Sequence, residues 1–175
     1  GLSVLDLAAR GDGAVYAATD GGIYRSMGRA WLRMPSLPAD ALQGPYGAEV
    51  GDFVGRLDVL DSGAPVVVNQ RMAWSWEDGW RRYGPAELPG AIFDVCVGAD
   101  GTALLASDRK GLWAQDHMGE WRRLDGGFLD GLEVVGSLIA NDVTFAATTS
   151  GLMARDAGGE WSVVAGMART VTDVE

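Results

Sequence analysis

Residues 144–155 read TFAATTSGLMAR, and a tryptophan, Trp161, follows six positions later. This order of a small-residue strand, a turn, a second strand and a tryptophan occurs four times along the chain. The other copies are 15–26 (VYAATDGGIYRS, then Trp31), 65–76 (PVVVNQRMAWSW, then Trp80) and 104–115 (LLASDRKGLWAQ, then Trp121). The tryptophans are 49, 41 and 40 residues apart, and such regular spacing indicates a structural repeat.

Each copy reads as four short strands. Gly22, Gly111 and Gly151 fall between the second and third strands, where a turn requires a residue that adopts a positive φ. The fourth strand begins at the tryptophan and alternates apolar with polar side chains, as a half-solvated strand does. The inner strands are 4–7 (VLDL), 57–60 (LDVL), 92–95 (IFDV) and the stretch from 134 onward. No stretch has helical periodicity over ten or more residues, so the sequence predicts an all-β fold.

Four-stranded repeats of about 40 residues are typical of β-propeller blades. We therefore predict a β-propeller of four-stranded antiparallel blades, with four blades in a single propeller unit spanning 1–175. The expected blades are 1–36, 52–88, 90–127 and 131–168. Residues 37–51, which include prolines and glycines, are expected to form an inserted loop. A plain rim insertion and a binding loop are both open for this segment.

The last residues repeat the inner-strand pattern once more. Residues 171–174 read VTDV, although all four blades already have an inner strand. We interpret 169–175 as the start of a further blade; the alternative is a tail that matches by chance. An open array of blades would expose an apolar face at each end. We therefore expect either a closed four-bladed ring or half of a larger propeller, completed by self-association or by a second chain.

The turn before each tryptophan resembles a known motif. Residues 151–161 (GLMARDAGGEW) are similar to the Asp-box, the S-x-D-x-G-x-x-W turn of sialidase-like (BNR) and Ycf48-like propellers. Residues 76–80 (WEDGW) and 114–121 (AQDHMGEW) match more loosely, and 26–31 (SMGRAW) lacks the aspartate. The repeats are also similar to the sensor propellers of two-component regulators. This resemblance covers the whole chain as architecture.

The resemblance implies structural roles for the motif residues. In the family, the Asp-box aspartate accepts backbone hydrogen bonds within the turn, and the tryptophan packs between blades. We therefore expect fold roles, rather than ligand contacts, for two sets of residues. They are the aspartates Asp78, Asp116 and Asp156 and the tryptophans Trp31, Trp80, Trp121 and Trp161.

Aspartates in the inner strands are the candidate ligand-binding residues. Asp6, Asp58 and Asp94 are expected at equivalent positions, and Asp173 repeats them near the C-terminus. Such carboxylates would ring a central funnel and would bind a cation, a basic group or sugar hydroxyls. The alternative is that each accepts hydrogen bonds from neighbouring backbone amides.

The sequence offers little for catalysis. His117 is the only histidine and falls in a turn before Trp121, so a histidine-activated nucleophile has no support. Cys96, the only cysteine, reads as a small apolar residue of an inner strand. A single cysteine excludes an intrachain disulfide, and one cysteine with one histidine excludes the usual zinc sites. We predict no catalytic residue, no metal site and no cofactor.

The chain is acidic. Its 175 residues include 14 Lys and Arg against 24 Asp and Glu, a net charge of −10. A field of this sign repels phosphate, which argues against nucleic acid as a partner. No apolar run approaches the roughly 18 residues of a membrane span. We expect neither a signal peptide nor a transmembrane segment in this sequence, and the compartment stays open.

We interpret the chain as a non-catalytic binding or assembly scaffold that presents a funnel and a loop face to a protein or small ligand. One alternative is a sialidase-like glycoside hydrolase or carbohydrate-binding propeller whose site needs further blades. It is weakened because sialidases require an F/Y-R-I-P motif, which the sequence lacks, and an arginine cluster, whereas most arginines here fall on the expected outer strands. A third interpretation is the sensor domain of a signalling protein.

Overall fold

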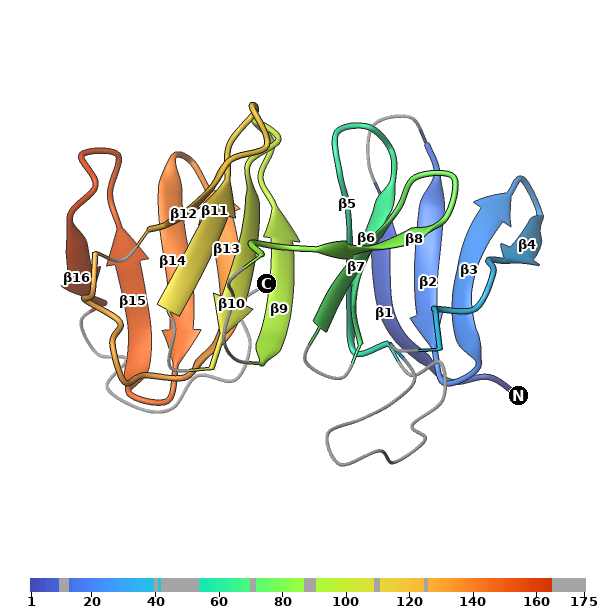
Figure 1. Ribbon diagram of the computed structural model, residues 1–175, viewed down its shortest axis with the longest axis horizontal. Helices are drawn as coiled ribbons and strands as arrows, with labels where there is room; N and C mark the ends of the chain where they lie inside the picture. The colour runs from blue at the N-terminus through green and yellow to red at the C-terminus, as the bar shows by residue number, and fades with distance from the viewer. Residues whose placement is uncertain are drawn as a thin grey trace. The chain divides into compact units, whose positions relative to one another are not determined.

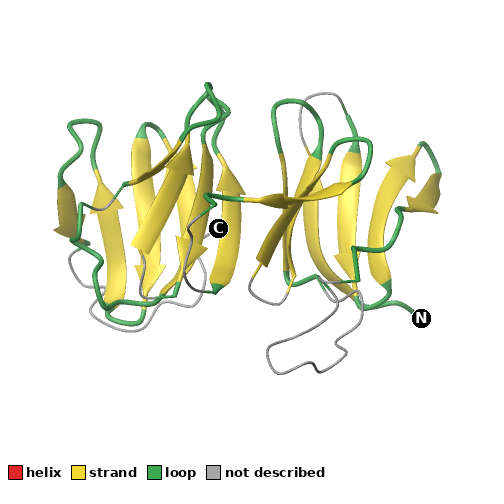
Figure 2. Cartoon of the chain, in the orientation of Figure 1, coloured by secondary structure: helices red, strands yellow, loops and turns green. Residues whose placement is uncertain are grey.

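The computed structural model describes residues 1–9, 13–39, 41, 54–69, 72–86, 91–108, 111–124 and 126–164. The regular elements in these ranges are all β-strands (Figure 2). Among the described residues, no helix has the length and apolar character that a membrane crossing requires. The predicted inserted loop, 37–51, lies mostly outside these residues, and the predicted start of a further blade, 169–175, lies wholly outside them.

The strands form four sheets of four strands each, and within each sheet the strands follow one another in chain order (Figure 1). The first sheet contains β1 (Val4–Ala9), β2 (Val15–Thr19), β3 (Gly22–Met27) and β4 (Ala30–Arg33). The second contains β5 (Arg56–Val59), β6 (Pro65–Asn69), β7 (Met72–Trp76) and β8 (Trp80–Tyr83). The third contains β9 (Ile92–Val97), β10 (Ala103–Ser107), β11 (Gly111–Gln115) and β12 (Trp121–Arg123). The fourth contains β13 (Val134–Ala140), β14 (Val143–Thr148), β15 (Gly151–Arg155) and β16 (Trp161–Val163).

Every neighbouring pair of strands is antiparallel. The prediction of an all-β fold built from four-stranded antiparallel blades is therefore confirmed. In the first three sheets the second strand is the most buried, and in β6 and β10 every residue is buried. Small and β-branched side chains in these strands suit such close packing.

The chain divides into two compact units, Gly1–Tyr83 and Gly84–Glu175, and each unit holds two sheets. In the first unit, Tyr16, Ile23 and Trp74 belong to one apolar core. In the second unit, Leu104, Leu112 and Met153 belong to another. Each core contains residues of both sheets of its unit, so the sheets of a unit pack face to face.

The turn between the second and third strands is tied in the same way in three of the sheets. A buried hydroxyl at the end of the second strand donates a hydrogen bond to the carbonyl of the glycine that opens the third strand. The pairs are Thr19–Gly22 (2.7 Å), Ser107–Gly111 (3.0 Å) and Thr148–Gly151 (2.7 Å). The three glycines have φ values of 116°, 70° and 124°, which confirms the expectation that these turns require a positive φ.

We predict that Thr148→Val lowers the free energy of unfolding by about 1–2 kcal/mol, because a buried acceptor and a donor lose their partner. The Thr148 hydroxyl also accepts a hydrogen bond from the Ser150 N–H at 3.1 Å. Thr149→Val is the matched control, since Thr149 is the adjacent residue and is exposed. Urea unfolding of the three proteins measures the difference, and equal losses in both variants would contradict the role of this hydroxyl.

Candidate functional site

Strand register identifies the equivalent position in each inner strand. The reference residues are Ala18, Val68, Ala106 and Ala147, each one position before the end of the second strand of its sheet. Their partners on the inner strands are Asp6, Arg56, Asp94 and Gly136, respectively. The prediction that Asp58 is equivalent to Asp6 and Asp94 is therefore wrong. Asp58 pairs with Val66 and lies two residues farther along its strand.

A local resemblance in the sequence explains the misplacement. In the first, third and fourth sheets a β-bulge lies just before the reference position, and β5 begins at that position. Residues 57–59 (LDV) resemble 5–7 (LDL), but it is Arg56 that holds the register position of Asp6. Asp58 therefore falls two residues beyond the position that its sequence pattern suggests.

Two inner-strand aspartates join the sheets of their unit. The Oδ2 of Asp94 accepts hydrogen bonds from the Ser137 N–H at 2.7 Å and the Ser137 Oγ at 3.0 Å, and all these groups are buried. The Oδ2 of Asp6 accepts a hydrogen bond from the Leu57 N–H at 2.8 Å. Ser137 and Leu57 hold the same register position in their sheets. We call this contact the aspartate tie.

In the aspartate ties, Asp6 and Asp94 accept hydrogen bonds from backbone amides, which is the alternative to ligand binding that the sequence left open. The Oδ1 of Asp58 accepts a hydrogen bond from the N–H of Val59 at 2.7 Å, within its own strand. Asp173 lies outside the described residues. A ligand-binding role for Asp6, Asp58 and Asp94 stays a prediction, and any ligand would compete with backbone amides for them.

Two tryptophans make a second connection between sheets, at their outer strands. The Nε1–H of Trp80 donates to the carbonyl of Pro35 at 2.8 Å, and that of Trp161 donates to the carbonyl of Leu124 at 3.3 Å. Leu124 directly follows β12, and Pro35 lies two residues after the end of β4, so both acceptors lie at the outer edge of the preceding sheet. The Phe128 ring also stacks on Trp161, with centroids 6.1 Å apart. We call this contact the tryptophan tie.

Two of the predicted Asp-box aspartates close their turns as the resemblance implies. The Oδ1 of Asp116 accepts hydrogen bonds from the N–H groups of Met118 at 2.9 Å and Glu120 at 3.1 Å. The Oδ1 of Asp156 accepts a hydrogen bond from the N–H of Glu160 at 2.9 Å. These turns are built around a carboxylate and lie at the surface.

The third aspartate of this set lies in a different turn. Asp78 has a φ of 56°, and the N–H of Glu77 donates to the carbonyl of Gly79 at 3.1 Å. The turn is shorter than those at Asp116 and Asp156. Aspartate suits this position because aspartate and asparagine adopt the left-handed conformation more readily than most residues.

The remaining chemically reactive residues are placed apart from one another. His117 is exposed in the turn that Asp116 closes, and Cys96 is a half-buried residue of β9 that packs against the core of the second unit. Within the described ranges, no three His, Cys, Asp or Glu side chains gather in a way that could hold a metal ion.

The first sheet carries an exposed apolar face, which we call the outer face and define by Val4, Leu7 and Trp31. Leu7 is 60% exposed, whereas Leu57 at the same register position is 5% exposed. Val4 is 59% exposed, whereas its equivalent Val134 is fully buried. In the second and fourth sheets these positions are covered by the preceding sheet of the unit.

Trp31 differs from its equivalents in the same way. Its side chain is 51% exposed, whereas Trp80 and Trp161 are half-buried and tied to a carbonyl of the preceding sheet. The Leu7 N–H, which corresponds to the N–H groups bound in the aspartate ties, donates instead to the Oδ1 of Asp6 at 2.9 Å. The outer face thus has its inner-strand amide satisfied, and its tryptophan is half exposed.

The repeat predicts that an open array exposes an apolar face at each end, but it does not identify the residues of the outer face. Its inner strand, 4–7, has the same apolar pattern as the inner strands that are buried, and Trp31 occupies the same repeat position as the other tryptophans. The difference in exposure becomes visible only once the two sheets of a unit are packed together.

No protein-family model matches the sequence, and no curated protein matches it either. Several solved structures are similar to the fold. A streptogramin B lyase has a TM-score of 0.65 and 11% identity over 91% of this chain and 53% of that one. YCF48 from Cyanidioschyzon merolae has a TM-score of 0.66 and 16% identity over 96% of this chain and 61% of that one. YCF48 has also been solved bound to D1 peptide, with a TM-score of 0.58, 13% identity, and coverage of 97% of this chain and 69% of that one.

A third similar structure is the extracellular domain of a putative hybrid two component system from B. thetaiotaomicron. Its TM-score is 0.55, with 11% identity over 91% of this chain and 27% of that one. These neighbours are β-propellers, so the chain has a β-propeller fold. The chain spans about half the length of the first solved structures that it matches.

We predict that Asp94→Ala destabilises the second unit by about 1–3 kcal/mol, because the Ser137 N–H becomes a buried donor without an acceptor. Asp94→Asn, which keeps a carbonyl oxygen, is expected to lose less. Thermal unfolding of both variants measures the order. If Asp94→Ala left the stability unchanged, the aspartate tie would not contribute, and the carboxylate would be free for a ligand.

Asp116 provides a prediction about pH. The N–H of Glu120 lowers the pKa of this carboxyl below its ordinary value of 3.8, and the Met118 N–H and the charges of His117 and Arg122 lower it further. A lowered pKa in the folded state gives stability that is present above pH about 4 and is lost as the pH falls through the folded value. Asp116→Asn should therefore be less stable than the wild type at pH 7, with a difference that shrinks toward pH 2. A constant difference across this range would contradict the role of the charge.

Proposed function

We propose that the chain is a non-catalytic β-propeller scaffold for binding and assembly, and that the outer face of its first sheet takes the fourth sheet of a second copy. The observation that carries this proposal is the exposure of Val4, Leu7 and Trp31, which form one apolar face. Apolar side chains at the equivalent positions of the second and fourth sheets are covered within their units. A face of this kind is an interaction surface by its chemistry.

We call the interface between the two packed sheets of a unit a seam. The two seams show what kind of element would cover the outer face. There the covering element is the face of a preceding four-stranded sheet, which supplies apolar side chains and one carbonyl for the indole N–H. An element with the same chemistry would bury Leu7 as Leu57 is buried and would give Trp31 the acceptor that Pro35 gives Trp80. A propeller sheet meets both needs.

The fourth sheet of a second copy has an inner strand suited to cover the outer face. Its side that is turned away from the third sheet presents Leu138 and Phe145, which pair across β13 and β14 and are half-buried. Gly136 stands where Asp6 and Asp94 form ties, so this sheet offers no carboxylate. None is needed, because the equivalent N–H on the outer face already donates to Asp6.

The outer strand of the fourth sheet also supplies the acceptor for a tryptophan tie. The N–H of Val164 donates to the carbonyl of Leu152, just as the N–H of Leu124 donates to that of Leu112. Val164 therefore corresponds to Leu124, whose own carbonyl accepts the hydrogen bond of Trp161. Trp31 of one copy would donate to the Val164 carbonyl of the other.

The comparisons are compatible with this assembly. Two copies would supply eight four-stranded sheets, and the chain spans about half the length of the first similar propellers. The similar structures include YCF48 bound to D1 peptide and an extracellular domain of a two component system. The same fold in a peptide-bound protein supports a binding role for this chain.

We predict a native mass of twice 18.4 kDa for this chain in solution, measured by light scattering on a sizing column. Leu7→Lys should shift the mass to that of one chain, because a charge placed in the seam is desolvated without a partner. Trp31→Phe removes the indole N–H together with part of the ring, and should weaken association at least about fivefold.

Met118→Lys is the matched control. Met118 is the most exposed large apolar residue of the second unit and lies in an Asp-box turn, away from every seam described above. It should leave the mass unchanged. A wild-type mass of 18.4 kDa at all concentrations would overturn self-association, and a double mass that survives Leu7→Lys would overturn the outer face as its site.

A further inference from the structure

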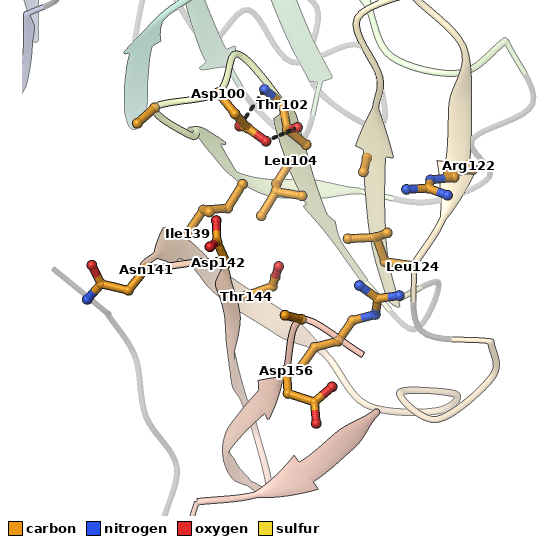
Figure 3. Close-up of a pocket in the computed structure, with 14 residues that line it drawn as sticks. Asp100, Thr102, Leu104, Arg122, Leu124, Ile139, Asn141, Asp142, Thr144 and Asp156 are labelled. Atoms are coloured by element: carbon orange, nitrogen blue, oxygen red, sulfur yellow. Dashed lines mark hydrogen bonds between the residues drawn. The ribbon is translucent and has the colours of Figure 1, made fainter. Parts of the chain in front are cut away.

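A cleft of about 680 Å³ lies between the third and fourth sheets, wholly within the second unit (Figure 3). Its walls are two cross-strand rows of side chains, one on each facing sheet. The row on the third sheet is Leu104, Ala114 and Arg122, and the row on the fourth sheet is Ile139, Thr144 and Arg155. Each row begins with an apolar residue near the core and ends with an arginine toward the outer strands.

The first unit has aromatic side chains at the corresponding positions. Tyr16, which corresponds to Leu104, is buried and donates its hydroxyl to the carbonyl of Gly63 at 3.0 Å. Trp76, which corresponds to Arg155, packs edge-on against Trp80 with ring centroids 5.3 Å apart. The same wedge between two sheets is therefore filled with rings in one unit and lined with an aliphatic and a charged side chain in the other. The cleft is a property of these particular residues.

Arg155 has an unused donor in the cleft. Its Nε is buried and has no hydrogen-bond partner among the described residues. Its guanidinium lies beside the turn of Asp156, where a Cβ at Gly159 would be only 2.8 Å from the Nη2. Neither Arg155 nor Arg122 forms an ion pair within the described part of the chain. A buried donor without an acceptor is costly, and a carboxylate satisfies a guanidinium best.

The rim of the cleft carries carboxylates. Asp142 follows Asn141 in a two-residue turn in which both residues have positive φ, 50° and 61°. In Figure 3 its carboxylate lies beside Ile139 and Thr144, on the side of the hollow. Asp100 also lines the cleft and is held by Thr102, whose N–H and Oγ donate to its two oxygens at 3.0 and 2.9 Å. These acceptors suit an ammonium group and would repel a ligand that is only anionic.

The floor of the cleft is aliphatic. Leu104 is fully buried, and Leu124 and Ile139 are half-buried beside it. Among the described residues that line the cleft there is no aromatic ring on which a sugar could stack. The volume is within the range of small-molecule sites.

We propose that this cleft binds a small zwitterion with an aliphatic body, that is, an apolar α-amino acid or a very short peptide. The ligand carboxylate binds Arg155 and Arg122, its ammonium binds Asp142, and its side chain contacts Leu104 and Ile139. A free amino acid and a short peptide both carry an ammonium, a carboxylate and an aliphatic side chain. The inference is independent of the assembly proposed above, because the cleft needs neither the outer face nor a second copy.

Isothermal titration calorimetry of the full chain with four compounds tests the proposal. Leucine is the probe amino acid and leucyl-leucine the probe peptide; N-acetyl-leucine lacks the ammonium and leucinamide lacks the carboxylate. We expect leucine or leucyl-leucine to bind, and both blocked compounds to bind at least tenfold more weakly. The tighter of the two probes identifies the source. Tight binding of N-acetyl-leucine would overturn the zwitterion, and no binding of either probe would overturn the site.

Variants assign the binding to the cleft. Arg155→Gln and Asp142→Asn should each weaken the probe about tenfold. Arg155→Trp, which introduces the ring found at Trp76, should abolish binding while thermal unfolding shows a folded chain. Arg25→Gln, in the first unit, is the control and should bind as the wild type does. Unchanged affinity in all three cleft variants would overturn the proposal.

Discussion

A sheet that is apolar on both faces leaves water only when another sheet covers each face, and this requirement governs the seams of the molecule. Within each unit the requirement is met by packing two sheets together. Polar contacts then fix how they pack: the aspartate tie at the inner strands and the tryptophan tie at the outer strands. Each tie includes a backbone group of the neighbouring sheet, and the tie of Asp94 adds the side-chain hydroxyl of Ser137.

The same requirement indicates that the outer face of the first sheet is an interaction surface. Val4, Leu7 and Trp31 have the residue types of a covered face but the exposure of an uncovered one. Asp6 serves both sides of its sheet, because one oxygen binds the Leu57 N–H and the other binds the Leu7 N–H. The Asp6 carboxylate thereby binds the second sheet and also satisfies the Leu7 N–H. A sheet that packs on the outer face therefore need not supply an acceptor for that N–H.

Much of this architecture was predictable from the sequence. The repeat of tryptophans, the turn glycines and the aspartates of the turns at Asp116 and Asp156 depend on local geometry, and local geometry leaves a local pattern. Asp58 was misplaced because 57–59 (LDV) resemble 5–7 (LDL), although Arg56 holds the register position of Asp6, and only the strand pairing reveals this. The cleft was not predictable, because Leu104 and Arg155 are distant in sequence and face each other only once two sheets are paired and packed.

The order of strands within each sheet has a consequence for how the chain folds during synthesis. Every sheet consists of four consecutive strands, and each tie reaches only to the next sheet. Such an array orders progressively from its start, with little need for distant chain closure. Within such an array a sheet can order before the sheets that follow it in the chain. Val4, Leu7 and Trp31 then remain in water while the following strands emerge, so their exposure is also an exposure to other nascent chains.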